Sequence, residues 1–511
     1  MKKWKGRKLL ILDDILEKKI QNKIYLLHIL FNVKLVSLEE VESYLNLKDF
    51  QVKEMISKIN DNLRNSDSKI KLIRKKIYLE NKAAIEESEL THAIYSTSYI
   101  LDYFDFIINN NSEKNFSDFI DKYYLSHATA YRIRKKVKDY LLYEGLNIKG
   151  NVVVGKEYKI RYLIALLHYK FGVKYKKITN EDIGVARSFI LAADDVTDNF
   201  LDITNKEYHF FEILVVLTWV RFPINLDTNE WSDFEKLKTL SIYKHLLSRS
   251  KKYLENRVKL SFSSEDYDYL YLAYLSTDNS LFVELWNQND MDKVYEIILK
   301  NEKVTDLMNI IVENFQLGKH IISSPIFLVS ILYLYKRFIL NLQTFIPINR
   351  FLLPDNQGKF RVELENKISK FGKKWAVGNN ISFSIEQSTI LYFTYQIETL
   401  YTSMLSPTDL IIVTDSIVDY EILKTKIISE YGIENINPII FLITRRSIKE
   451  LSLIDNSIIV FEPKFYSIVN RFSKNNTRLV ELSIEFFNVN INKLKSILDS
   501  FQEERLLNFL E

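Results

Sequence analysis

The fold of the N-terminal region is decided by residues 116–155, FSDFIDKYYLSHATAYRIRKKVKDYLLYEGLNIKGNVVVG. Residues 117–124 predict a short amphipathic helix, and Ser126 is a suitable N-cap for a second helix that runs to about residue 143. Residues 147–154, with a Gly-Asn pair at the bend, predict a β-hairpin. Helix, turn, helix and hairpin in this order describe a winged helix-turn-helix, whose second helix enters the major groove of DNA.

The second helix of this unit separates an apolar face from a basic face. The apolar residues recur at helical spacing and are Ala130, Ile133, Val137, Tyr140 and Leu141. A basic helix face is more often simply solvated, but the hairpin directly after the helix favours DNA binding. The residues expected to contact DNA in this unit are Ser126, His127, Ala128, Tyr131, Arg132, Arg134, Lys135 and Lys138. Because few side chains at the N-terminal end of this helix are polar, we expect modest sequence specificity and a contribution from DNA shape.

Residues 23–80 repeat the same plan in a weaker form. Ser37, with Glu40 three residues later, predicts a capping box at the start of a helix. A further helix over 48–63 and a hairpin over 70–79 follow. Since that helix has mixed charge, this unit is expected to rely on its hairpin more than on its helix. The residues expected to contact DNA in this unit are Gln51, Lys53, Lys71, Arg74, Lys75 and Lys76.

Composition predicts a multidomain, soluble, cytoplasmic protein without enzymatic chemistry. A chain of 511 residues is too long for a single core, and the absence of cysteine excludes disulfides and thiolate metal sites. No apolar run is long enough to span a membrane. Residues 1–170 hold 31 Lys and Arg against 22 Asp and Glu, whereas the remainder is acidic, as expected for a DNA-binding region joined to a regulatory body. No nucleotide-binding, zinc-protease or serine-hydrolase motif occurs, so no cofactor and no metal are predicted.

The rest of the chain predicts helical bundles followed by an α/β domain. Helices are expected at 90–109 and 156–171, and in two bundles at 182–192, 207–221, 233–248, 264–275, 304–317, 325–342, 359–371 and 385–404. After Pro407, short β-branched runs alternate with helical stretches, which implies a largely parallel sheet covered on both faces. Its strands are expected at 410–413, 438–443, 457–461 and 478–482, and its helices at 418–430 and 490–510.

These predictions describe a multidomain, mainly α chain with two tandem winged helix-turn-helix domains, two helical bundles and a C-terminal α/β domain. The expected bounds are 1–85 and 86–172 for the winged domains, 173–290 and 291–405 for the bundles, and 406–511 for the α/β domain.

The second winged unit resembles the Mga/AtxA family of transcriptional regulators from low-GC Gram-positive bacteria. The likeness is carried by LSHATAYRIRKKVKDYLLYEGLNI (residues 125–148), by Gly155-Lys156-Glu157 and by Arg161, and the order of domains is similar over essentially the whole chain. In that family, two helix-turn-helix units precede two helical domains regulated by the phosphotransferase system (PRDs). A C-terminal domain like the IIB component of sugar phosphotransferase systems (EIIB-like) follows. The resemblance therefore implies two PRD-like bundles and an EIIB-like domain here.

The resemblance also implies a transcriptional activator that binds double-stranded promoter DNA as a homodimer, with the EIIB-like domain contributing to the dimer. It implies histidine phosphorylation by the sugar phosphotransferase system through the phosphocarrier protein HPr. His209 matches the family's phosphorylatable position best, and His245 and His320 are weaker candidates. The alternative interpretation of His209 is an ordinary surface histidine near a helix start. No histidine follows His320, which puts control at a second site in doubt.

The EIIB-like domain differs from its enzyme relatives at one position. A working IIB component carries a phosphocysteine in the loop after its first strand, whereas this sequence has Thr414-Asp415-Ser416. Without a thiolate nucleophile the domain cannot relay phosphate by that route. A dimerisation or partner-docking role is expected instead.

Two other functions are compatible with the sequence. The first is an RNA-binding antiterminator, because similar regulatory domains occur in such proteins. Those proteins carry a small all-β RNA-binding domain, however, and this N-terminus is helical with hairpins. The second is an assembly protein with degenerate helix-turn-helix units, which the mixed charge of residues 48–63 makes more plausible for the first unit than for the second.

Overall fold

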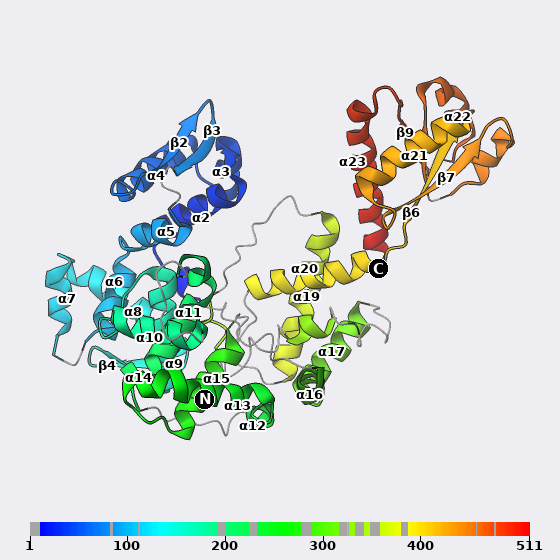
Figure 1. Ribbon diagram of the computed structural model, residues 1–511. Helices are drawn as coiled ribbons and strands as arrows, with labels where there is room; N and C mark the ends of the chain where they lie inside the picture. Colours follow the sequence, from blue (N-terminus) through cyan, green and yellow to red (C-terminus); the bar gives the residue numbers. More distant parts are fainter. Residues whose placement is uncertain are drawn as a thin grey trace. The chain divides into compact units, whose positions relative to one another are not determined.

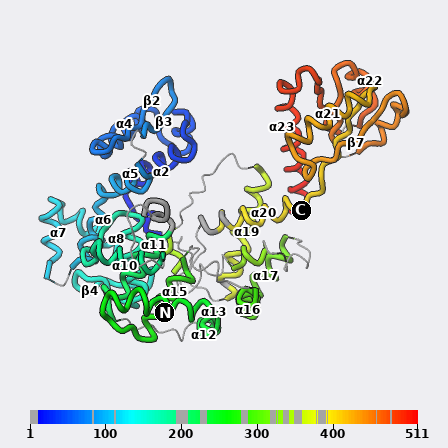
Figure 2. The backbone as a smooth tube through the Cα atoms, in the orientation of Figure 1, coloured from blue at the N-terminus to red at the C-terminus, as the bar shows by residue number. Residues whose placement is uncertain are grey.

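The computed structural model describes most of the chain (Figures 1 and 2). The described residues are 11–81, 85–110, 113–191, 201–223, 232–277, 288–315, 324, 327–332, 342–347, 358–379, 387–455, 457–474 and 477–510. The chain divides into two compact units. Unit 1 comprises Met1–Leu307, Ile331–Leu353 and Ala376–Thr389, and unit 2 comprises Met308–Ser330, Pro354–Trp375 and Ile390–Glu511.

The first winged unit has the predicted helices and hairpin, with one additional strand. Ser37 and Glu40 form the predicted capping box, in which the Ser37 hydroxyl accepts from the Glu40 amide at 3.2 Å. The short strand before this helix pairs with the hairpin and makes a three-stranded antiparallel sheet of order β1-β3-β2. That strand was not predicted, because a three-residue run carries no usable alternation. The elements are α1 (Leu12–Ile15), α2 (Lys18–Val33), β1 (Leu35–Ser37), α3 (Leu38–Leu45), α4 (Asp49–Asn62), β2 (Ser68–Ile73) and β3 (Lys76–Asn81).

The second winged unit confirms the helix, turn, helix and hairpin order predicted from residues 116–155. The prediction of a single helix at 90–109 is wrong, because these residues form two helices. Ser98 caps the second of them by accepting from the Leu101 amide at 3.4 Å, and its hydroxyl donates to Glu17 at 2.6 Å. The elements are α5 (Glu87–Tyr95), α6 (Tyr99–Ile108), α7 (Phe116–Lys122), α8 (His127–Tyr143), β4 (Leu146–Lys149), β5 (Val152–Gly155) and α9 (Glu157–Phe171).

Helices occupy most of the described chain between residues 180 and 404, as predicted. The prediction of a single helix at 233–248 is wrong in one respect, because the chain forms two helices there, separated at Lys238–Leu240. Of the helix expected at 325–342, residues 327–332 and 342 are described; residues 327–332 are helical and residue 342 is not. The elements are α10 (Asn180–Leu191), α11 (Leu201–Val220), α12 (Ser232–Leu237), α13 (Ser241–Ser250), a π-helical turn (Lys251–Glu255), α14 (Asn256–Val258), α15 (Ser264–Ser276), α16 (Gln288–Leu299), α17 (Glu302–Asn314), α19 (Lys359–Gly378) and α20 (Gln387–Met404).

The C-terminal domain confirms the predicted parallel sheet covered on both faces. Its four strands are all parallel, in the order β7-β6-β8-β9. Alternate residues of β6 point to opposite faces. Leu410 and Ile412 pack with α21 and α23, while Ile411 and Val413 pack on the side of α22 (Figure 1). The elements are β6 (Thr408–Thr414), α21 (Ile417–Tyr431), β7 (Ile436–Leu442), β8 (Ile458–Phe461), α22 (Tyr466–Phe472), β9 (Arg478–Glu481) and α23 (Phe487–Asn508).

Among the described residues, none of the helices combines the length and the apolar character that crossing a membrane requires.

Candidate nucleic-acid interface

Helix α8 presents the exposed face that the sequence analysis selected. The Ser126 hydroxyl accepts from the Thr129 amide at 3.3 Å, which confirms Ser126 as the N-cap of this helix. The predicted apolar face is buried against the rest of the domain, and Phe104 of α6 meets Tyr140 edge to face at a centroid distance of 6.0 Å. The remaining predicted contact residues of this helix are exposed, except for the half-buried Arg134; the exposed ones are Ser126, His127, Ala128, Tyr131, Arg132, Lys135 and Lys138.

Two of these side chains are positioned by an aromatic residue of α7. The Arg134 guanidinium lies over the Phe116 ring, 4.8 Å from its centroid, and the Tyr131 ring meets the same ring at 5.3 Å. Arg132 in turn donates to the Thr129 hydroxyl at 3.1 Å. Because these contacts restrict the rotamers before any ligand arrives, less side-chain entropy remains to be lost on binding.

The lysines of α8 are free to meet an anion. Within the described part of the chain, Lys135 and Lys138 form no ion pair, and neither does Lys136, an exposed neighbour that the sequence analysis left out. The apolar face of the helix lies away from all three. This helix therefore carries three ammonium groups that form no ion pair with a carboxylate of the described chain.

The hairpin that follows α8 is held in place at its tip. Asn110 donates to the Asn151 carbonyl at 3.3 Å, and Asn151 donates to the Lys114 carbonyl at 3.0 Å. At the base of the hairpin, Gly155 has φ +151°, and a Cβ there would lie 2.6 Å from the Leu146 side chain. Only glycine fits this close approach without strain. The tip of the hairpin is thus fixed to the connection before α7, and its two strands approach closely at its base.

The predicted contact residues of the first winged unit are mostly engaged within the protein. The Gln51 side chain accepts from the Lys48 amide at 2.9 Å, so it serves as a helix cap. Three lysines form ion pairs: Lys53 with Asp49 at 2.9 Å, Lys71 with Glu80 at 2.9 Å and Lys75 with Glu39 at 2.8 Å. Arg74 and Lys76 are exposed and form no ion pair with described residues. A phosphate that approached the three paired lysines would have to replace an existing carboxylate partner.

The geometry of α5 to α9 coincides with a known domain. The family model of the Mga helix-turn-helix domain matches residues 83–168, which span these helices and the hairpin. Residues 83–168 are an Mga helix-turn-helix domain. The match is consistent with the Mga-family regulators and indicates a DNA-binding transcriptional regulator; such regulators are generally not enzymes. A search of curated proteins finds no match to the chain.

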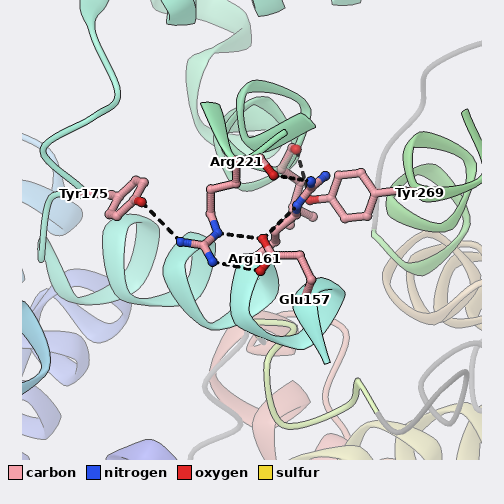
Figure 3. Close-up of polar contacts among 6 residues, drawn as sticks. Glu157, Arg161, Tyr175, Arg221 and Tyr269 are labelled. Carbon is pink, nitrogen blue, oxygen red and sulfur yellow. Dashed lines mark hydrogen bonds and ion pairs between the residues drawn. The ribbon is translucent and has the colours of Figure 1, made fainter. Parts of the chain in front are cut away.

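The last helix of the Mga helix-turn-helix domain is locked to the helices that follow it (Figure 3). The Glu157 carboxylate accepts two hydrogen bonds from Arg221, at 2.6 and 2.7 Å, and a third from Arg161 at 3.3 Å. Arg161 is fully buried; it also donates to the Arg221 carbonyl at 2.7 Å, and its guanidinium lies 4.5 Å from the Tyr269 ring centroid. The Tyr175 hydroxyl accepts from Arg221 at 3.2 Å. One carboxylate therefore balances two guanidinium groups in a largely buried site.

The other end of the same helix meets the first phosphorylation candidate. His209 of α11 lies beside His168 and Tyr169, with centroid distances of 6.0 Å in both cases. Since Arg221 follows α11 and meets the start of α9, while His209 meets the end of α9, the two helices are antiparallel and fixed at both ends. Figure 1 shows α9 and α11 among the helices of unit 1.

Carboxylate and histidine neighbours define the surroundings of His209. Its Nδ1 lies 2.9 Å from the buried Glu212, whose other oxygen accepts from Arg187 at 2.9 Å. The pKa of His168 is lowered to about 4, mainly by burial and to a smaller extent by the neighbouring His209. Burial likewise lowers the pKa of His92, which contacts the Tyr169 carbonyl at 3.0 Å. At neutral pH, His92 and His168 are therefore uncharged.

Of the other two phosphorylation candidates, only His245 is described, and it is not part of this cluster. His245 is exposed on α13, and His320 lies outside the described residues.

The C-terminal end of α8 is joined to a distant part of the chain. Glu144, the buried C-cap residue, accepts from the Thr344 hydroxyl at 2.6 Å, and its carbonyl accepts from Lys159 at 2.9 Å. Thr344 belongs to the described segment 342–347, in which Leu342 and Phe345 are fully buried. This segment is part of the same compact unit as α8.

The shared carboxylate gives a testable expectation for α9. Replacing Arg221 by Gln removes a bidentate partner from Glu157, and we expect the junction of α9 and α11 to lose about 2 kcal/mol of stability, because breaking one partner leaves a poorly solvated charge behind. Hydrogen exchange of the α9 amides measures this loss. Arg64→Gln, which breaks an exposed pair with Asp61, is the control and is expected to change the same amides by less than about 0.5 kcal/mol. Equal effects of the two substitutions would contradict the expectation.

Proposed function

We propose that this chain is a transcriptional activator that binds double-stranded promoter DNA through α8 of its Mga helix-turn-helix domain. The observation that carries the proposal is the exposed face of α8, whose lysines have no carboxylate partner among the described residues. The paired lysines of the first winged unit support a secondary role for that unit. A helix that carries unneutralised cations on a face opposite its buried side suits the major groove and its flanking phosphates.

The side chains divide into two roles along α8. His127, Ala128 and Tyr131 lie at the N-terminal end, where recognition helices contact base edges. Lys135, Lys136 and Lys138 lie farther along and are proposed to contact phosphates. Arg134, whose guanidinium lies over the Phe116 ring, is proposed to contact the DNA backbone from a fixed direction. Since the base-facing set offers few hydrogen-bonding groups, DNA shape is proposed to contribute to the choice of site.

The DNA-binding role is tested by a salt titration of the full chain on a fragment from upstream of its own gene. Replacing Arg134, Lys135 and Lys138 by Ala is expected to weaken binding to all sequences alike. It should also lower the slope of log affinity against log salt by about 0.9 for each phosphate that the variant no longer neutralises, because fewer counterions are released. The measurement is fluorescence anisotropy at several salt concentrations.

The control is the triple replacement of Lys53, Lys71 and Lys75 by Ala, which removes the same number of cations from residues that already have carboxylate partners. We expect a smaller change in slope. If the α8 variant binds with the parental affinity and slope, α8 is not the DNA reader. Stronger competition by RNA hairpins than by duplex DNA would favour an antiterminator instead.

Regulation is proposed to act at His209 through phosphotransfer from HPr of the sugar phosphotransferase system. The contact between Nδ1 and Glu212 supports this, because it leaves Nε2 as the nitrogen available to a phosphoryl donor, and about 32% of the side chain is exposed. A phosphoryl group would bring up to two negative charges beside the buried Glu212 carboxylate. Repulsion between them would favour release of Glu212, and Arg187, now bonded to that carboxylate, would be drawn to the phosphoryl group.

Phosphorylation at this position has a direct test. In a mixture with phosphoenolpyruvate, enzyme I and HPr, the parent chain is expected to gain an acid-labile phosphoryl group, whereas His209→Ala is not. Intact-mass analysis measures the gain, and His245→Ala is the matched control that should still be phosphorylated. His209→Asp and His209→Ala are then compared for promoter output. If both give parental output, His209 has no regulatory role.

Self-association is proposed to use the EIIB-like domain. The support for this proposal is an exposed apolar strip on α21, formed by Ile417, Val418 and Ile422. These residues line a shallow groove together with Glu421, Thr425 and Lys426. Exposed apolar patches of this kind are typical of interaction surfaces. The Ser416 hydroxyl caps α21 by accepting from the Asp419 amide at 3.3 Å, so the loop that holds the phosphocysteine in IIB components serves here to start this helix.

Replacing Ile417 and Val418 together by Lys is expected to convert a dimer into a monomer, because two ammonium groups would be buried against their own copies. Light scattering coupled to gel filtration measures the mass. Leu453→Lys, at an exposed leucine outside the strip, is the control and should leave the mass unchanged. A double variant that retains the parental mass would exclude this surface.

A further inference from the structure

Tyr124 stands apart from every other aromatic residue of the Mga helix-turn-helix domain. It lies in the turn between α7 and α8, and 96% of its surface is exposed. Its backbone adopts φ +51°, the left-handed region. Its amide donates to the Asp121 carbonyl at 3.4 Å, and the next amide, that of Leu125, donates to the Ile120 carbonyl at 3.1 Å. The turn is thus closed by the backbone alone.

The Tyr124 side chain contributes nothing to the described fold. Among the described residues, no ring contact, hydrogen bond or ion pair involves it. Its neighbour Tyr123 behaves differently: that ring packs on Phe119 at 5.1 Å and on Tyr99 at 6.5 Å, and its hydroxyl accepts from Lys122 at 2.9 Å. The two adjacent tyrosines therefore have different roles: the half-buried Tyr123 packs on other rings of the domain, whereas Tyr124 lies in solvent.

The backbone at Tyr124 is one that tyrosine disfavours. A residue with a Cβ in the left-handed region is strained, and turns between the two helices of such motifs often contain glycine at no such cost. A large ring left in water adds no packing that would offset this strain. A strained residue that the fold does not need is a candidate for function.

We propose that Tyr124 contacts the DNA backbone at the edge of the major groove, through its hydroxyl to a phosphate oxygen and its ring to the adjacent sugar. Its location supports this, because Tyr124 precedes the N-cap Ser126 by two residues, and recognition helices enter the groove with their N-terminal end. Tyrosine hydroxyls are among the donors that proteins use for phosphate contacts. The assignment rests on the proposed DNA-binding function and adds a residue to it.

An uncharged contact has a signature that separates it from the lysines of α8. Phenol carries no charge, so its removal changes no counterion release and leaves the salt slope unchanged. Glycine at the same position removes the ring and relieves the left-handed backbone. The Tyr124→Gly substitution should therefore weaken DNA binding while it preserves or raises the stability of the domain, two effects of opposite direction.

The test uses the full chain with Tyr124→Gly and Tyr124→Phe, on the same duplex and over the same salt series. We expect Tyr124→Gly to lower affinity by more than roughly tenfold, because it removes both a hydrogen bond to a charged group and the contact of the ring with the sugar, with the parental slope and an unfolding midpoint no lower than that of the parent. Tyr124→Phe, which retains the ring, should lose less. Tyr466→Ala, at an exposed tyrosine of the C-terminal domain, is the control and should bind as the parent does.

Each alternative result overturns a defined statement. Parental affinity in Tyr124→Gly, while the parent binds and the triple α8 variant does not, would overturn the Tyr124 assignment alone. A reduced salt slope or a lowered unfolding midpoint in Tyr124→Gly would show that it acts by displacing α8, which also overturns the assignment. Failure of the parent to bind duplex DNA would overturn the proposed function and this inference together.

Discussion

The arrangement of unit 1 depends on a single carboxylate shared by two guanidinium groups. Glu157 sits at the first turn of α9, immediately after the hairpin, and binds both Arg161 of its own helix and Arg221 at the end of α11. A buried arginine without such a partner would be strongly unfavourable, so the three residues constrain one another. Because the hairpin leads directly into α9, the position of the hairpin is tied to that of the helices that follow the Mga helix-turn-helix domain.

The two winged units show how similar secondary structure can carry different electrostatics. Both have a helix, a turn, a helix and a hairpin, and both are rich in lysine. In the first unit, carboxylates lie within reach of Lys53, Lys71 and Lys75. In the second, the lysines of α8 lie on a face without such partners among the described residues. Net charge counted along the sequence does not distinguish the two units. The pairing of lysines with carboxylates in space does distinguish them.

Most of the fold could be predicted from the sequence, because its signals are local. The face of α8 followed from apolar spacing between Ala130 and Leu141, and the capping box from Ser37 and Glu40. The parallel sheet followed from short β-branched runs between helices. The prediction of one helix at 90–109 is wrong because the apolar pattern continues across the break, where Ser98 caps the second helix.

The features that position the candidate site are non-local, and the sequence could not supply them. Glu157 and Arg221 are 64 residues apart, and Arg134 finds Phe116 only once α7 and α8 cross. No residue pattern specified the exposure or the left-handed backbone of Tyr124, since its neighbour Tyr123 has the same side chain and packs on Phe119. The DNA-contact residues themselves stay a prediction, because they depend on a partner that is not part of the fold.

The hydrogen bond from Thr344 to Glu144 bears on what counts as a module in this protein. The family match ends at residue 168, yet Glu144, the C-cap residue of α8, accepts a hydrogen bond from a residue 200 positions later. Arg161, inside the match, is buried by Tyr269, outside it. A fragment cut at the boundary of the match would expose a guanidinium that is shielded from solvent in the intact chain. The part recognised by the family match is therefore smaller than the compact unit that contains it, and the helical region is part of the structural support of the Mga helix-turn-helix domain.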